Sequence, residues 1–205
     1  MSRRALVFAI ALVAGFDDAA AAALEVTVVD QDGRPVPDAV VLLRAPAAAP
    51  PTAPVPGIID QIDKRFVPAV SAVPVGTSMS FPNRDDIKHH VYSFSPPKVF
   101  ELKLYHGVPA APVVFDRPGL VTLGCNIHDG MVAYLYVVDA ATFALTDARG
   151  SVRFADGTET ASVEAWHHQM DGEPVRATVA PGHPEGSLTL VLPLLAAAVL
   201  PPPLE

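Results

Sequence analysis

The sequence predicts an all-β chain, and three observations carry this prediction. The 205 residues include 22 prolines, a density that disfavours long helices and suits strands joined by turns. Short segments alternate between outward and inward positions with a period of two, as residues 77–81 do. Turn signals rich in Gly, Pro and Asp, such as 31–33 and 116–119, separate these segments. We therefore expect a β-sandwich.

The first 23 residues have the pattern of a secretory signal peptide. Arg3 and Arg4 precede an apolar stretch at 5–16, which is too short to span a membrane, and small residues follow at 19–23. The alternative interpretation is a buried N-terminal helix. We expect a signal peptide at 1–23, a periplasmic protein, and no membrane span after cleavage.

The elements that follow are expected to be strands in chain order. Segments 24–30 and 35–43 flank a turn and predict a hairpin, and the Ala/Pro-rich stretch 45–56 predicts an extended surface linker. Residues 170–187 are polar and predict a loop, while 188–200 predicts a terminal strand or an apolar tail. Further strands are expected at 77–81, 89–94, 113–115, 121–125, 131–138, 151–154 and 162–166.

Charge narrows the range of partners. The formal net charge is −8, with 14 basic and 22 acidic residues. Removal of 1–23 takes away two of each, Arg3 and Arg4 with Asp17 and Asp18, so the value does not change. An acidic protein is a poor nucleic-acid binder, and we expect no nucleic-acid partner. We expect a monomer kept soluble by this charge.

A single cysteine, Cys125, limits the redox chemistry. It excludes an internal disulfide, a dinuclear copper site built on two cysteines, and the Cys-x2-Cys-His attachment of a c-type haem. A free thiol in an oxidising compartment is a liability unless it is buried or bound to a metal. The surroundings of Cys125 are therefore the first place to look for a functional site.

Those surroundings contain the spacing of a metal-binding loop. Cys125, His128 and Met131 form Cys-x2-His-x2-Met. Blue-copper sites use one thiolate and two imidazoles in a near-trigonal plane with a weak axial thioether. A short loop between two strands can supply three of these four ligands, so the second imidazole has to come from a distant segment.

Two adjacent histidines, His89 and His90, are the upstream candidates. Neighbouring strand residues point to opposite faces, so only one of the two histidines can face the metal. This alternation alone does not tell which one. His106, His183 and the pair His167–His168 lack ligand spacing with the cysteine, and we expect them to be solvated surface residues.

The two segments together resemble the cupredoxin family, which includes plastocyanin and amicyanin. Upstream, Asn83, Asp85, His89 and Val91 match the family's N-x-D/E-x-x-x-H-x-V pattern, and downstream 115–131 matches its second half. The words HHVYSFSPPKVFELKLY and LGCNIHDGM are similar to plastocyanin-like proteins labelled methylamine utilization proteins. One departure is Gly124, where relatives usually carry an aromatic or other larger residue.

The resemblance implies a Greek-key β-sandwich and one type 1 copper ion that cycles between Cu(I) and Cu(II). It implies that His89, Cys125, His128 and Met131 hold the ion, with His128 as the electron exit. A closed ligand set leaves no position for a substrate, so we expect an electron carrier and not an enzyme. The expected partner is a c-type cytochrome or a periplasmic oxidoreductase. The alternative is a periplasmic copper-binding or delivery protein.

The flanks suggest a second, split unit. Residues 29–40 and 145–150 look like the two halves of a carboxypeptidase-regulatory-like β-sandwich, with the copper domain inserted between them. The alternative is that these strands only extend the cupredoxin sheet. The expected domains are a signal peptide, a split sandwich, a copper domain and a tail, at 1–23, 24–58 with 140–180, 59–139 and 181–205.

Overall fold

The computed structural model describes residues 23–44, 54–109, 111–140, 142–155, 161–179 and 186–195. Within these ranges the chain forms seventeen strands and no helix, which confirms the all-β prediction. No helix in these ranges is long and apolar enough to cross a membrane. The expected signal peptide lies outside the described residues except for Ala23, and so does most of the expected linker.

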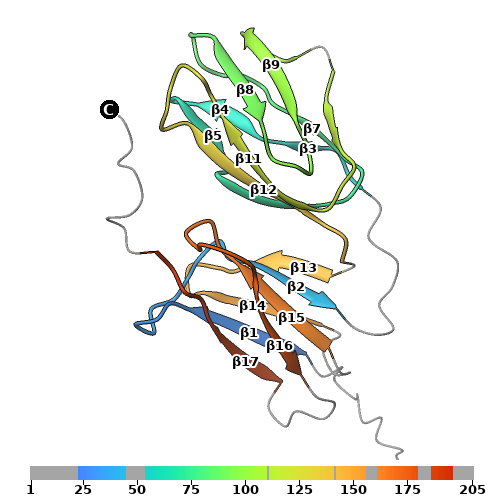
Figure 1. The fold of residues 1–205 in the computed structure, drawn as a ribbon, viewed down its shortest axis with the longest axis vertical. Coiled ribbons are helices and arrows are strands. Elements are labelled where there is room, and N and C mark those ends of the chain that lie inside the picture. The colour runs from blue at the N-terminus through green and yellow to red at the C-terminus, as the bar shows by residue number, and fades with distance from the viewer. Residues whose placement is uncertain are drawn as a thin grey trace, which may run out of the picture.

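The strands form two β-sandwiches stacked on one another (Figure 1). We call the one built from the middle of the chain the upper sandwich and the one built from the two flanks the lower sandwich. The upper sandwich contains β3 (Gly57–Ile58), β4 (Asp60–Ile62), β5 (Arg65–Val67), β6 (Val70–Pro74), β7 (Thr77–Ser80), β8 (His89–Ser93), β9 (Phe100–Tyr105), β10 (Val113–Phe115), β11 (Gly119–Gly124) and β12 (Val132–Val138). The lower sandwich contains β1 (Leu24–Val29), β2 (Val40–Arg44), β13 (Thr142–Leu145), β14 (Ser151–Phe154), β15 (Ala161–Trp166), β16 (Val175–Val179) and β17 (Ser187–Val191).

The upper sandwich packs a five-stranded sheet, β6-β12-β11-β8-β9, against a three-stranded sheet, β10-β7-β3. The chain changes sheet after β6, β7, β9 and β10, which is the crossing pattern expected of a Greek key. Inward side chains of both sheets share one apolar core, in which Met79 and Phe115 face Val91, Val121 and Leu135. This confirms the predicted β-sandwich.

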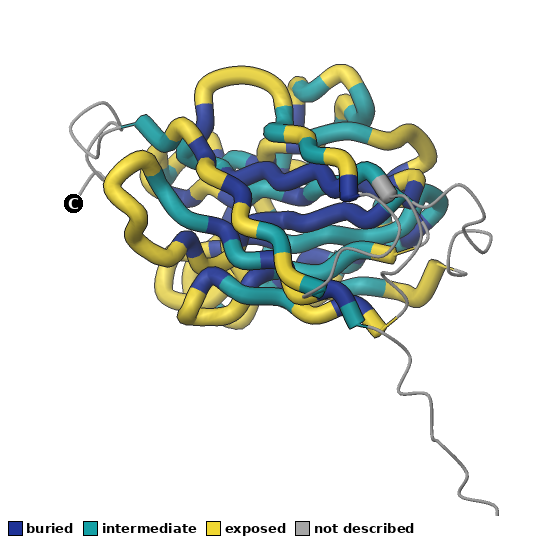
Figure 2. Tube along the Cα trace, turned by 90° about the horizontal axis from the view of Figure 1, so that it is seen from below, coloured by how far each residue is buried: buried dark blue, intermediate teal, exposed yellow. Residues whose placement is uncertain are grey.

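The lower sandwich draws its strands from both ends of the described chain. Its sheets are β14-β1-β17 and β13-β2-β15-β16, so strands from the N-terminal flank pair with strands from the C-terminal flank. Strand β2 is buried along 40–43, as expected for a strand that is covered on both faces. Figure 2 shows that buried segments run through the middle of the molecule and that exposed residues gather in the outer loops. The domain division stays a proposal, which this pairing between the flanks supports.

Two local predictions for the flanks are wrong. Strands β1 and β2 do not form a hairpin, because β1 pairs with β14 and β17 in one sheet while β2 pairs with β13 and β15 in the other. The segment predicted as a loop at 170–187 contains β16, which pairs with β15. For 188–200 the alternatives were a terminal strand and an apolar tail. The first part of this segment forms β17, which pairs in parallel with β1, and residues 196–200 lie outside the described residues.

The sandwiches meet through aromatic side chains. On the outer face of β12, Tyr134 and Tyr136 lie 6.0 and 5.6 Å from the ring of Trp166, measured between ring centroids. The ring of His168 stacks on Tyr134 at 5.1 Å. The part of this face around β12 is therefore covered by the lower sandwich. The loop at 125–131, which joins β11 to β12, has exposed residues at 126, 127, 129 and 130.

Candidate metal centre

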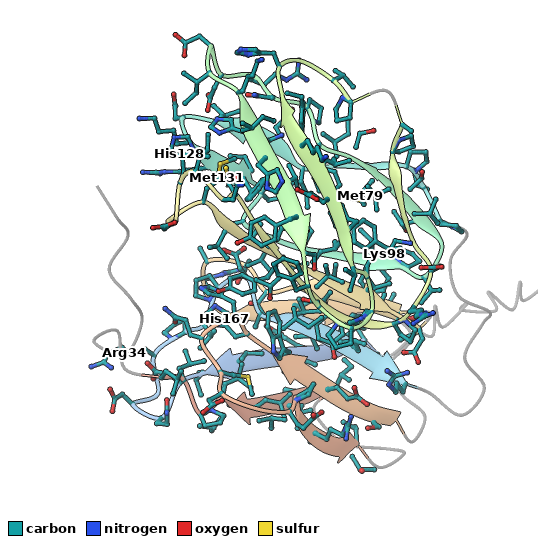
Figure 3. All side chains as sticks on the ribbon, turned by 45° about the horizontal axis from the view of Figure 1, so that its top comes forward. Arg34, Met79, Lys98, His128, Met131 and His167 are labelled. Carbon is teal, nitrogen blue, oxygen red and sulfur yellow. The ribbon has the colours of Figure 1, made fainter. Side chains whose placement is uncertain are left out.

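The Cys-x2-His-x2-Met segment forms the tight loop that joins β11 to β12. Cys125 directly follows β11, and Met131 directly precedes β12. Two backbone hydrogen bonds close the loop, from Met131 N–H to the His128 carbonyl at 2.9 Å and from Cys125 N–H to the Met131 carbonyl at 3.2 Å. The loop therefore brings these three side chains to one end of the sandwich, where Figure 3 shows His128 beside Met131.

His89 approaches the loop from the neighbouring strand. Strand β8 pairs with β11 through Tyr92 and Gly124, which places the start of β8 next to the loop. The His89 and His128 ring centroids are 5.0 Å apart, and Cys125 Sγ lies 3.8 Å from His128 Nδ1. One ligand atom from each of His89, Cys125 and His128 lies within 4.8 Å of the other two. A single ion could contact all three.

A carboxylate orients the His89 ring. Nε2–H of His89 donates a hydrogen bond of 2.6 Å to Asp85 Oδ2, and the same carboxylate accepts bonds from the backbone N–H groups of Asp63 and Lys64. Burial opposes the charge on Asp85, but these donors and the His89 ring hold its pKa below the usual range. With its proton on Nε2, His89 keeps a free lone pair on Nδ1.

That Nδ1 atom is buried and has no hydrogen-bond partner among the described residues. Buried polar atoms without partners are rare in proteins, and each one calls for an explanation such as an ion. Metal-binding histidines commonly donate their second ring N–H to a carboxylate, as His89 does to Asp85. Nδ1 of His90 and Nδ1 of His168 are also buried without a partner, so the free atom alone does not mark a ligand. What sets His89 apart is that it also lies beside Cys125 and His128, and this combination fits a metal ligand.

Asn83 holds the Asp85 turn in place. Its Oδ1 accepts a hydrogen bond from Asp85 N–H at 3.0 Å, and its Nδ2 donates to the carbonyls of Ile87 and Tyr105 at 2.8 Å each. In the sequence, Asn83 and Asp85 stand out only as positions in the upstream pattern. Their roles in orienting His89 were not predicted, although the four-residue step from Asp85 to His89 was an available signal.

His128 lies at the boundary between the core and solvent. Burial lowers the pKa of its imidazole, and the nearby His89 lowers it further. The neutral ring that this favours is the form that binds metals. The adjacent side chain, Ile127, is 48% exposed, so the loop presents an apolar residue to solvent beside the half-buried His128.

His90 points away from this cluster. Its Nε2 lies 2.9 Å from Glu101 Oε1, and its ring lies 5.4 Å from that of Tyr92 on the outer face of β8. The structure therefore brings His89, and not His90, to Cys125. The assignment of His89 as the ligand stays a prediction, and this geometry supports it.

The donor set matches copper better than other common metals. One thiolate, two imidazoles and one thioether are the ligands of a blue-copper site, while structural zinc sites use four Cys or His ligands. Cys125 is 3% exposed and Met131 is 1% exposed, so both sulfur atoms are shielded from water. The residues present therefore fit a copper site whose sulfur ligands are shielded from water.

The remaining histidines differ in their exposure to solvent. His106 is exposed, as expected, and His183 lies outside the described residues. The prediction of solvated side chains is wrong for His167, which is 5% exposed. Its ring lies 4.1 Å from that of His168, which stacks on Tyr134 of the other sandwich. Burial lowers the pKa of His167 to about 4.

No protein-family model and no curated protein matches the chain. Among solved structures, the chain is similar to a Cu-containing nitrite reductase from Thermus scotoductus SA-01, with 25% identity over 46% of this chain and 26% of that one, at a TM-score of 0.39. It is also similar to a purple cupredoxin from Nitrosopumilus maritimus, with 22% identity over 41% of this chain and all of the other, at a TM-score of 0.36. A mutant amicyanin gives 17% identity over 47% and 98% of the two chains, at a TM-score of 0.38. The chain thus covers about a quarter of the nitrite reductase, and these structural neighbours are copper proteins of low identity.

Proposed function

We propose that this protein is a periplasmic type 1 copper protein that carries single electrons between redox partners. The observation that carries the proposal is the group of buried His89, buried Cys125 and half-buried His128, whose ligand atoms lie within 4.8 Å of one another. Met131 would complete the proposed set with a weak thioether ligand. When bound, copper supplies a one-electron couple between Cu(I) and Cu(II).

The protein's own residues make that couple usable. Asp85 and Asn83 fix the His89 ring before any metal arrives, and the backbone bonds of the 125–131 loop fix the other side chains. A preformed site changes little between oxidation states, so little reorganisation opposes electron transfer. Burial of Cys125 protects its thiol from oxidation. A closed set of four ligands binds no substrate, so the proposal is a carrier and not an enzyme.

The proposed route to a partner passes through His128. Its half-buried ring and the exposed Ile127 give the copper end a small apolar surface on which a redox protein can dock. We propose a c-type cytochrome or a periplasmic oxidoreductase as that partner, and a monomeric carrier. The methylamine utilization subtype and export by the leader at 1–23 belong to the same proposal.

Voltammetry and metal transfer separate the carrier from a copper-delivery protein. We expect the copper-loaded protein to give a reversible one-electron wave and to retain Cu(I) in the presence of a moderate Cu(I) chelator. The matched control is Met131→Leu, which keeps the volume but removes the thioether. Rapid loss of Cu(I) to the chelator from the unmodified protein, without a reversible wave, would favour delivery instead.

A further inference from the structure

Gly124, the residue before Cys125, makes room for an aromatic ring from another strand. Its backbone pairs with Tyr92 of β8. A Cβ atom built on Gly124 would lie 2.8 Å from Tyr92 Cζ and 2.9 Å from its Oη. Gly124 is not among the described residues with positive φ, so backbone freedom does not account for the glycine. What the glycine provides is direct contact between the Tyr92 ring and the backbone next to the proposed copper thiolate.

From Tyr92 the aromatic contact continues to the surface. The rings of Tyr92 and Phe94 are 5.1 Å apart between centroids, a distance typical of packed aromatic pairs. The two residues are two positions apart at the end of β8 and lie on its outer side. Phe94 is 80% exposed. One peptide link and two packing contacts therefore connect Cys125 to solvent on a face of the sandwich that is separate from the His128 loop.

The other aromatic group near β12 does not offer such a route. Tyr134 pairs with Thr122, which is three residues from Cys125, and its ring contacts Trp166 and His168. These rings lie between the two sandwiches, where a partner cannot dock. The route through Tyr92 leaves the chain at Gly124, one residue from Cys125, and ends at the exposed Phe94.

Resting on the proposed electron-carrier function, we propose that Tyr92 and Phe94 form a second electron route from Cys125 to the outer side of β8. Cys125 would supply the thiolate ligand of the proposed site, and one peptide bond joins its backbone to Gly124. Tunnelling weakens most across gaps without bonds or contacts, and packing of Tyr92 on Gly124 removes such a gap. One electron passes from Cu(I) to a one-electron oxidant at Phe94, giving Cu(II) and the reduced oxidant; no proton moves and no bond breaks.

Two labelled forms of the copper-loaded protein test this route. A thiol-reactive ruthenium polypyridyl complex is attached at Phe94→Cys in one form and at Ile127→Cys, beside His128, in the other. Flash oxidation of the label with an oxidative quencher produces Ru(III), and the rate at which it oxidises Cu(I) is recorded. Each label is combined with Tyr92→Leu, which removes the ring, and with Gly124→Ala, which displaces it. Tyr92→Phe is the matched control that keeps the ring.

We expect Tyr92→Leu and Gly124→Ala to slow oxidation from position 94, Tyr92→Phe to leave it unchanged, and none of them to alter the rate from position 127. The reduction potential should not change in any variant. In the copper-free protein, magnetisation transfer between the Tyr92 ring and the Gly124 Cα protons should be present and should be lost in Gly124→Ala.

Three results would overturn the proposal. An unchanged rate from position 94 in Tyr92→Leu would show that the ring does not couple the thiolate to this face. Equal slowing from both labels would show that Tyr92 acts only on the structure of the site. Absence of an intense blue band in the unlabelled protein would overturn the proposed function itself, and the route with it, so the two failures can be distinguished.

Discussion

The two sandwiches differ in what they bury. The lower sandwich has a large aliphatic core built around β1 and β2, and its buried polar residues are Thr146, Glu164 and His167. Among the described residues, the upper sandwich buries twice as many, which are Gln61, Thr77, Asn83, His89, His90 and Ser93. Because burial of polar groups costs free energy, their concentration in one sandwich marks where structure serves something other than stability.

Two buried hydrogen-bond arrangements, one from each sandwich, differ in how they end. In the lower sandwich the Thr146 hydroxyl accepts a bond from Ala39 N–H and donates to the Val36 carbonyl, so the polar group only links backbone segments. In the upper sandwich Asn83 holds Asp85, Asp85 holds His89, and the His89 Nδ1 atom has no partner among the described residues. The first arrangement is complete without a ligand, whereas the second leaves one ligand atom free.

The largest effect should come from the two adjacent histidines. His89→Ala removes the ring beside Cys125 and His128, so we expect loss of the blue-copper spectrum and of tight copper binding. His90→Ala removes a ring that pairs with Glu101, so copper binding should persist. Copper titration followed by visible absorption distinguishes them. Retention of the blue spectrum in His89→Ala, with its loss in His90→Ala, would reverse the assignment.

Acid should weaken the two sandwiches in different pH ranges. Burial lowers the pKa of His167 from 6.5 to about 4, so the unfolded chain takes up this proton first as the pH falls. Stability from the neutral ring is complete above pH 6.5 and is lost down to about pH 4, by up to about 3 kcal/mol. The pKa of Asp85 lies below its ordinary value of 3.8, so its contribution to stability is lost only under stronger acid.

Chemical denaturation of the copper-free protein between pH 7 and pH 4 measures this effect. His167→Gln should flatten the dependence in that range, and His106→Gln, at an exposed position, is the matched control. An equal slope in the unmodified protein and in His167→Gln would mean that His167 is not buried in the neutral form.

Asp85→Asn tests the hydrogen bond that orients His89. The amide can keep a hydrogen bond to the ring but not the charge, and loss of such a carboxylate partner typically lowers metal affinity roughly 10–100-fold. Competition with a copper chelator measures the change. Asp86→Asn, at the exposed neighbouring position, should have no such effect. Equal affinities in the two variants would remove Asp85 from the account of the site.

The smallest effect is expected in the lower sandwich. Thr146→Val leaves Ala39 N–H and the Val36 carbonyl without their side-chain partner, which should lower the free energy of unfolding by about 1–2 kcal/mol. Copper affinity should stay the same, because no part of the site changes. Thr142→Val, on the exposed side of β13, provides the control. A loss of copper affinity in Thr146→Val would show that the two regions are energetically coupled.

Local sequence patterns predicted one part of the site, whereas the rest depends on contacts between residues that are far apart in the chain. Cys125, His128 and Met131 could be recognised because a single short loop fixes their spacing. Adjacent residues have opposite parity, so His89 could be favoured over His90 only through the resemblance of the upstream segment. The contact of Tyr92 with Gly124 could not be predicted from the sequence, because it depends on which strands are neighbours in the sheet.

Dependence on long-range contacts also explains why some predictions about the fold were wrong. The turn between β1 and β2 has the composition of a hairpin, but strand pairing with distant segments places the two strands in different sheets. His167 was predicted to be solvated, but its ring lies 4.1 Å from that of His168, which stacks on Tyr134 of the other sandwich. Composition does not reveal this long-range packing. The strand pattern was predictable, and the partners of the flanking strands were not.

The visible spectrum of the Cu(II)-loaded protein, recorded with and without Cys125→Ser, tests the central claim most directly. The account predicts an intense blue band that arises from the Cys125 thiolate and disappears in the serine variant, while the fold is retained. A pale complex whose spectrum is the same in both proteins would contradict it, because copper would then be bound without the buried thiolate on which the proposed site depends.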